Sequence, residues 1–147
     1  MKVKRGTMEN KKGFQVKAPG KRAVRFRFSP KKSPLTCKAM EESFPFQARA
    51  VQARFAGEEI WIPRGPAKKI PREAASIHLR AGEMGYAPVL KRNTVARSIA
   101  IVYGTATLSG WVNVFATVFP EDRTLLKKLG ERIWLKGACT LKFELLK

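Results

Sequence analysis

The longest uncharged stretch of the chain is the feature that most constrains its fold. Residues 98–119 form a run of 22 residues without a charge, which is long enough to cross a bilayer as a helix. Asn113, two glycines and five serines or threonines lie within it and weaken its insertion into lipid. Its apolar residues gather in two runs, 99–103 and 111–119, rich in β-branched and aromatic residues. We therefore predict two buried strands joined by a turn, and no membrane partner.

Alternating apolar and polar residues predict further strands. Val24, Phe26 and Phe28 alternate with two arginines, which indicates a half-buried strand with a basic outer face. Patterns of this kind or short apolar runs predict further strands at 51–55, 60–62, 75–79, 132–136 and 140–146. Residues 63–71 and 81–88 are rich in proline and glycine and are expected to be loops and turns. The strand at 75–79 places His78 on its outward face, as a surface histidine.

Two segments have helical patterns. The first is 35–43, with Ser33 as the expected N-cap and a proline at the first helical position. The second begins after Phe119, with two acidic residues in its first turn and Gly130 as its expected C-cap. The sum is about eight short strands and two helices. This predicts a mainly β fold, a closed or nearly closed antiparallel barrel with helices over its ends.

The positive charge is concentrated near the N-terminus. The formal charge is +19, and residues 1–32 carry +11 of it, from twelve basic residues and one acid. Residues 1–20 also lack apolar periodicity, so we expect a disordered basic arm there and the barrel domain at 21–147. Such an arm is typical of nucleic-acid binding, although a solvated tail and a native start at Met8 are open alternatives. The candidate nucleic-acid contacts are Lys11, Lys12, Lys17, Lys21, Arg22, Arg25 and Arg27.

Few residues suit metal or acid–base chemistry. The two cysteines, Cys37 and Cys139, form no CxxC pattern, so we expect no metal and no cofactor. His78 is the single histidine, which excludes any serine or cysteine catalyst that does not use it. Adjacent Glu58 and Glu59 point to opposite faces of a strand and are interpreted as edge protection or a turn salt bridge.

The same composition bears on the compartment. No apolar signal segment follows the basic start, so a cytoplasmic protein is expected. The residue usage is compatible with a heat-adapted source, in which a disulfide between the two cysteines is conceivable.

Five short motifs occur in a characteristic order. They are GEEIW at 57–61, PRE at 71–73, GEMGYAP at 82–88, AIVYGT at 100–105 and VNVFATV at 112–118. In this order and spacing, residues 22–146 resemble the small prokaryotic cyclophilin-like proteins. The resemblance implies an eight-stranded cyclophilin-type barrel, in agreement with the element count.

The resemblance implies little isomerase activity. Cyclophilins use an arginine to polarise the prolyl amide and a histidine at the rim. Here Val112 takes the histidine-like place, and neither Arg54 nor Arg64 lies in a recognisable arginine motif. We therefore expect a peptide- or small-ligand-binding module, with residual prolyl isomerisation as the least favoured activity. The candidate ligand contacts are Tyr86, Tyr103, Trp111, Asn113 and Phe115, which could equally be core residues.

Overall fold

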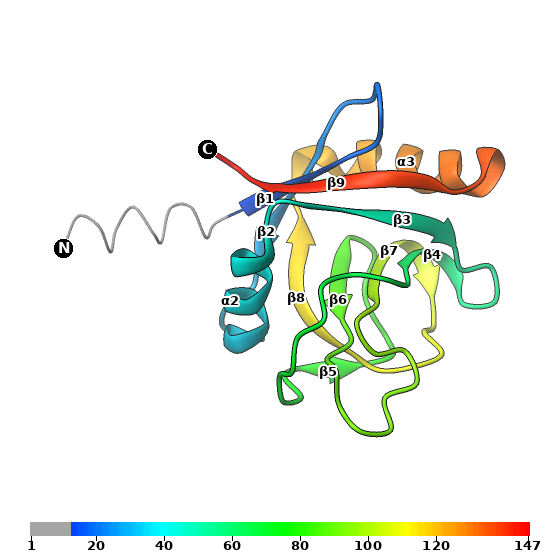
Figure 1. Cartoon of the computed structure of the whole chain (residues 1–147). Helices are drawn as coiled ribbons and strands as arrows, with labels where there is room; N and C mark the ends of the chain where they lie inside the picture. Colours follow the sequence, from blue (N-terminus) through cyan, green and yellow to red (C-terminus); the bar gives the residue numbers. More distant parts are fainter. Residues whose placement is uncertain (1–12) are drawn as a thin grey trace.

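The computed structural model describes residues 13–147, which form nine strands and two α-helices (Figure 1). The strands are β1 (Gly13–Lys17), β2 (Val24–Phe28), β3 (Phe46–Gln52), β4 (Gly57–Ile62), β5 (Ala75–Ser76), β6 (Glu83–Tyr86), β7 (Ile99–Ala106), β8 (Val112–Val118) and β9 (Cys139–Leu145). The helices are α2 (Pro34–Ser43) and α3 (Arg123–Lys136), the latter preceded by a 3-10 turn at Pro120–Asp122.

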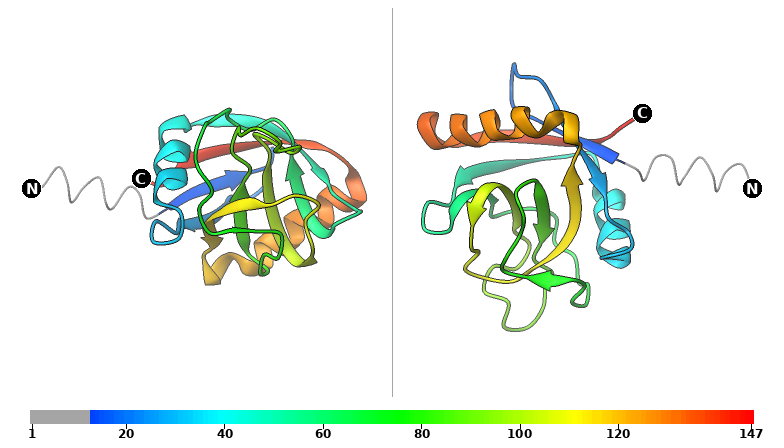
Figure 2. Two further views of the ribbon diagram at one scale, coloured as in Figure 1. Left: turned by 90° about the horizontal axis from the view of Figure 1, so that it is seen from below. Right: turned by 180° about the vertical axis from the view of Figure 1, so that it is seen from behind.

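Eight of these strands close into a barrel. Their order is β2-β1-β9-β3-β4-β7-β6-β8, and β8 pairs with β2 to complete the ring. Every pairing is antiparallel, and β5 adds to the outer edge of β8. The two helices pack on different sides of the barrel (Figure 2). The predicted fold class, a closed antiparallel barrel with two helices, is confirmed.

Strand β1 corrects the predicted start of the domain. Residues 13–17 fall within the segment expected to be disordered, yet β1 lies between β2 and β9. Phe14 and Val16 are fully buried. These two apolar residues, two positions apart, therefore form the inward face of a strand. The strand has only five residues, too few for its alternation of apolar and polar residues to be recognised in the sequence. Lys11 and Lys12 lie outside the described residues.

Aromatic side chains fill the interior. Phe14 is at the centre, with ring centroids 5.5 Å from Phe26, 4.9 Å from Phe28 and 6.4 Å from Phe143. Each buried ring contributes roughly 1.5–3 kcal/mol from area, and such pairs add about 0.5–1.5 kcal/mol. The barrel interior is thus a packed core.

The uncharged stretch forms two buried strands, as predicted. They are β7 and β8, and no helix among residues 13–147 is long and apolar enough to cross a membrane. The two strands are not neighbours, however, because β6 lies between them. This strand occupies part of the segment predicted as turns. Its Gly85 marks a bulge where a Cβ atom would overlap Val112, so the glycine serves close packing.

Helix α3 is longer than predicted. It continues through Gly130 and includes residues 132–136, which were wrongly expected to form a strand. A Cβ atom at Gly130 would overlap the ring of Tyr103, so this glycine permits close packing of the helix on β7. The helix ends instead before Gly137, whose φ of 97° suits glycine.

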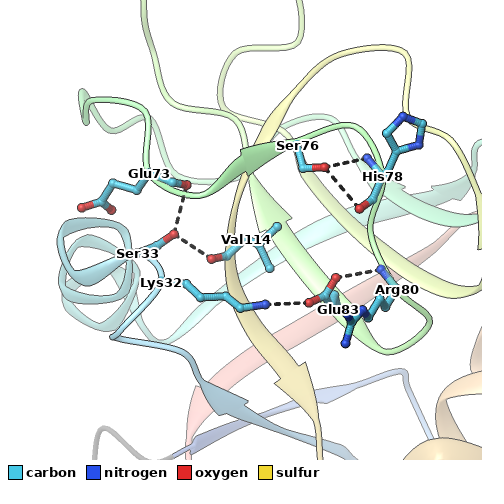
Figure 3. Close-up of polar contacts among 8 residues, drawn as sticks. All are labelled: Lys32, Ser33, Glu73, Ser76, His78, Arg80, Glu83 and Val114. Atoms are coloured by element: carbon cyan, nitrogen blue, oxygen red, sulfur yellow. Dashed lines mark hydrogen bonds and ion pairs between the residues drawn. The ribbon is translucent and has the colours of Figure 1, made fainter.

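Two other predicted strands differ in position. The strand expected at 51–55 is β3, which begins at Phe46, and Phe55 lies beyond it with 73% of its surface exposed. The strand expected at 75–79 is only two residues long, and Ile77 is exposed. His78 lies at the surface, as predicted, and Figure 3 shows contacts only to its backbone.

The role of β1 can be tested with one substitution. Phe14→Ala should lower the free energy of unfolding by about 3–5 kcal/mol, because it leaves a cavity among packed rings. Lys17→Ala, at the exposed end of the same strand, is the control and should change it by less than about 0.5 kcal/mol. Equal denaturation midpoints for the two variants would contradict the assignment of β1 to the core.

Candidate functional site

Two of the predicted ligand contacts hold a loop in place. Tyr86 is fully buried, and its hydroxyl donates to the carbonyl of Pro66 and accepts from the amide of Lys68. Asn113 is also fully buried, with Nδ2 donating to Thr36 Oγ1 and to the Pro71 carbonyl. Both side chains use their polar atoms to fasten the proline-rich segment 63–73 to the barrel.

The same segment caps helix α2. Ser33 was expected to cap it, but its hydroxyl contacts the carbonyls of Val114 and Glu73 instead (Figure 3). The carboxylate of Glu73 accepts from the backbone amides of Leu35 and Thr36, at 3.0 and 2.8 Å. The hydrogen-bond acceptor that an N-cap side chain usually provides is therefore supplied by a residue distant in the chain, which local spacing does not reveal.

The other three predicted contacts do not form a cleft. Phe115 is fully buried in the aromatic core, with its ring 6.2 Å from that of Phe14. Tyr103 is covered by α3, and its hydroxyl donates to Gln52. Trp111 is partly exposed, with the Arg72 guanidinium 4.2 Å from its ring centroid. The five candidates are thus core or anchoring residues at separate places.

The basic candidates divide into free and paired residues. Lys17, Lys21, Arg22 and Arg27 are exposed. Arg25 is held by Asp122, with Nε and Nη2 each donating to the carboxylate at 2.9 Å. Hydrogen bonds from Arg25 lower the pKa of Asp122 below its usual value. Arg25 therefore has a structural partner, so the basic strand offers less free charge than its sequence indicates.

Glu59, which the sequence analysis interpreted as edge protection or a turn salt bridge, has the most unusual surroundings. Strand β4 has an irregular register between Gly57 and Glu59. Glu58, at this bulge, accepts a hydrogen bond from the Thr105 amide at 2.8 Å. Glu59 follows on the outer face of the barrel and is only 4% exposed. The two glutamates thus have different environments, and the predicted role of edge protection does not describe Glu59.

Glu59 is buried beneath loops that cover the outer face of the sheet. A second apolar cluster lies there, separate from the barrel interior, and includes Val102, the cross-strand neighbour of Glu59. The cluster consists of Leu79, Ala87, Ala100, Val102, Leu108, Val112 and Val114. Backbone hydrogen bonds such as Thr107 to Ala56 and Arg97 to Ala87 tie the covering loops together.

A small cavity adjoins Glu59. Its volume is about 20 Å³, enough for one water-sized group. It is lined by Phe55, Glu59, Trp61, Val95, Ser98, Ala100, Leu108, Ser109, Gly110 and Val112. No lysine, arginine or histidine is among these residues. The cavity is therefore apolar apart from one carboxyl group, two serines and the backbone.

The electrostatics of Glu59 follow from this burial. Among residues 13–147, its carboxyl group has no hydrogen-bond or ion-pair partner, and burial of most of the side chain raises its pKa to about 7. Its oxygens keep a small exposed surface, since no fully buried side-chain oxygen of the described chain lacks a partner. Buried carboxyl groups are usually paired, since leaving one unpaired is costly. An unpaired acid facing a cavity is typical of a site that receives a ligand or a proton.

The cysteines contribute no comparable site. Both are free thiols, and burial raises the pKa of Cys37 to about 12, which keeps it protonated and unreactive. Within the described part of the chain, no three metal-ligating side chains gather in one place.

The protein is thus a closed antiparallel barrel with a largely buried glutamate, Glu59, beneath the loops on its outer face. The chain belongs to a family described as a protein of unknown function (DUF3830), whose model matches residues 19–145. The match begins after β1, so this strand lies outside the part that the family model describes. No curated protein matches the chain in sequence.

Solved structures share the fold at low sequence identity. McbB, solved in complex with tryptophan, has a TM-score of 0.72 and 15% identity over 89% of this chain and 44% of its own. The hypothetical protein AF2241 from Archaeoglobus fulgidus, solved in solution, has a TM-score of 0.61 and 12% identity, over 91% and 94% of the two chains. The chain thus spans less than half of McbB, and both likenesses concern the fold.

Protonation of Glu59 should be visible in the pH dependence of stability. Its pKa is raised from 4.5 to about 7 in the folded protein, so the fold loses stability as the pH rises from about 4.5 to about 7, where the unfolded chain has ionised Glu59 and the folded chain still holds the proton. Between about pH 4 and about pH 8, the free energy of unfolding of Glu59→Gln relative to wild type should rise by about 3 kcal/mol. Chemical denaturation at both pH values measures it. Glu42→Gln, on the exposed face of α2, is the control. An equal pH response of both variants and the wild type would refute the burial of an ionisable Glu59.

Proposed function

We propose that this protein binds a small organic molecule that carries a primary amine, and that Glu59 receives the amine. The single observation that carries the proposal is Glu59, a largely buried acid without a hydrogen-bond or ion-pair partner among residues 13–147, whose carboxyl oxygens stay accessible at a small cavity. A cation that enters supplies the partner that the folded chain lacks. The charge-assisted hydrogen bond then offsets the cost of ionising the acid in an apolar setting.

The size of the cavity selects the class of cation. A volume of about 20 Å³ accommodates an ammonium group but excludes a planar guanidinium or a ring. Ser98 is buried beside the cavity and donates its hydroxyl hydrogen to the Val95 carbonyl at 2.6 Å. Its oxygen retains lone pairs, so it is a second acceptor for an ammonium group.

The rest of the ligand would lie outside the cavity, against aromatic side chains. Phe55 is 73% exposed at the rim, and Trp61 lines the same cavity. Their rings favour an apolar or aromatic body attached to the amine. Because no basic side chain lines the cavity, a ligand carboxylate would find no partner there. The preferred ligand is therefore an arylalkylamine.

One comparison is compatible with this class. McbB, which shares the fold, has been solved with tryptophan, a molecule that joins a primary amine to an indole ring. The match covers 44% of McbB at 15% identity, and tryptophan also carries a carboxylate, so the comparison is compatible with the amine and the ring of the proposed ligand and goes no further.

Two earlier hypotheses stay predictions. Negligible prolyl isomerase activity is expected, because Val112 takes the histidine-like place and neither Arg54 nor Arg64 lies in an arginine motif that would polarise a prolyl amide. Non-specific nucleic-acid binding through exposed residues such as Lys17 and Arg27 is the alternative function. Its predicted site includes Lys11 and Lys12, which lie outside the described residues.

Calorimetry with tryptamine tests the proposal. Tryptamine should bind, and its affinity should rise up to about tenfold from pH 6 to pH 8, because ionised Glu59 attracts the ammonium. Tryptophol, which replaces the amine with a hydroxyl group, is the matched control ligand and should bind at least about tenfold more weakly. Glu59→Gln should abolish the preference for the amine. Binding of both ligands that is equal and unaffected by Glu59→Gln would exclude the proposal.

A further inference from the structure

A second cavity, larger than the one at Glu59, lies along helix α3 and has a different character. It is a groove of about 360 Å³ between helix α3 and the connection from β1 to β2. This volume is within the range of about 300–1,000 Å³ that is typical of ligand sites. The groove is lined by Lys21, Arg22, Val24, Leu125, Lys128, Leu129, Arg132, Leu135 and Lys136.

The groove has an apolar floor. Val24 and Leu129 are buried at its base, and Leu135 at its end is 77% exposed. Helix α3 packs on the barrel through Leu126, Leu129 and Ile133, with Leu125 partly buried against the same core. Leu135 does not belong to this contact, so it leaves apolar surface accessible to a partner at the end of the groove.

Five cations surround this floor. Lys21 and Arg22 lie on the β1–β2 connection, and the other three are on α3. Within the described chain, no carboxylate lies within 4 Å of any of the five, and the ion pairs of Arg25, Lys32 and Lys142 are elsewhere. No acidic residue lines the groove. Arg22 interacts at longer range with Asp122, which is already paired with Arg25. The other four cations have no ion-pair partner among residues 13–147.

The spacing of the three cations on α3 lowers the stability of the helix. Lys128, Arg132 and Lys136 are each four residues apart and so lie on one face of α3. Like charges at this spacing destabilise a helix by about 0.2–0.5 kcal/mol per pair. An anionic partner would remove this repulsion and gain attraction to all three residues.

We propose that this groove binds an acidic amphipathic helix of a partner protein. Apolar side chains of that helix would enter the floor, and its carboxylates would pair with the basic rim, as in other helix-in-groove complexes. The three helical cations extend over about 12 Å, or two helical turns. The partner segment therefore needs acidic residues repeated every three to four positions over at least two turns.

The shape and chemistry of the groove disfavour two other polyanions. Single-stranded nucleic acid binds through aromatic platforms, and no aromatic side chain lines this groove. An anionic bilayer is flat, so it would reach Leu135 but not Val24 or Leu129, which are buried at the base. A helix with protruding apolar side chains uses both the floor and the rim.

Fluorescence anisotropy with the full chain tests the proposal. The probe is a labelled 16-residue helical peptide with leucines on one face and glutamates on both sides of that face. A peptide of the same composition in scrambled order separates shape from charge. The helical peptide should bind at least about fivefold more tightly than the scrambled one. Labelled oligothymidylate and vesicles containing phosphatidylserine are tested in parallel.

Two matched double variants locate the binding. Lys128→Glu with Arg132→Glu should weaken peptide binding at least about tenfold. Lys31→Glu with Lys38→Glu makes the same change in net charge at exposed positions outside the groove and should have little effect. Leu135→Ser should weaken binding about threefold or more, and this loss measures the contribution of the apolar surface of the groove. Circular dichroism verifies that each variant is folded.

Several results would overturn the proposal. These are the absence of peptide binding at 1 mM, equal binding of the scrambled peptide, and equal loss in the two double variants. Binding of the oligonucleotide or of vesicles that depends on Lys128 and Arg132, without peptide binding, would assign the groove to that polyanion instead. Neither the peptide result nor its failure bears on Glu59, which lies in a different cavity.

Discussion

Closure of the barrel is the constraint on which the rest of the structure depends. Strand β8 pairs with β6 along one edge, and its other edge is shared by β5 and β2. The ring is complete only because β1 bridges β2 and β9. The closed interior is then filled by aromatic rings, with Phe14 among them. A ligand therefore has no room inside, and any binding site must lie on the outer face or at the ends of the barrel.

Much of the fold could be predicted from the sequence because alternation and capping patterns are local. They placed β2, α2 and the two buried strands of residues 98–119. The failures occurred where a distant contact decides the local structure. Gly130 has the pattern of a helix end, but it lies inside α3. A glycine is needed there because the ring of Tyr103 packs directly on its backbone. Gly85 has the pattern of a turn, yet it lies in a strand because Val112 needs the space.

The candidate site was less predictable for the same reason. Tyr86 and Asn113 have the chemistry of ligand contacts, but their polar atoms hold the segment 63–73. The GEE motif did carry a signal, since only one of its glutamates faces outward beside Trp61. Glu59 is buried because loops close over the outer face of the sheet. Local sequence patterns do not specify that burial, and it is burial that raises the pKa of Glu59.

The account rests on Glu59 as a buried acid that ionises near neutral pH. The most direct test is the titration of its side-chain carboxyl carbon by NMR in uniformly ¹³C-labelled protein, assigned by the loss of the signal in Glu59→Gln. The account predicts a midpoint at about pH 7, well above the usual 4.5. A midpoint at the usual value would show a solvated or paired carboxyl group, and would contradict the proposed amine site.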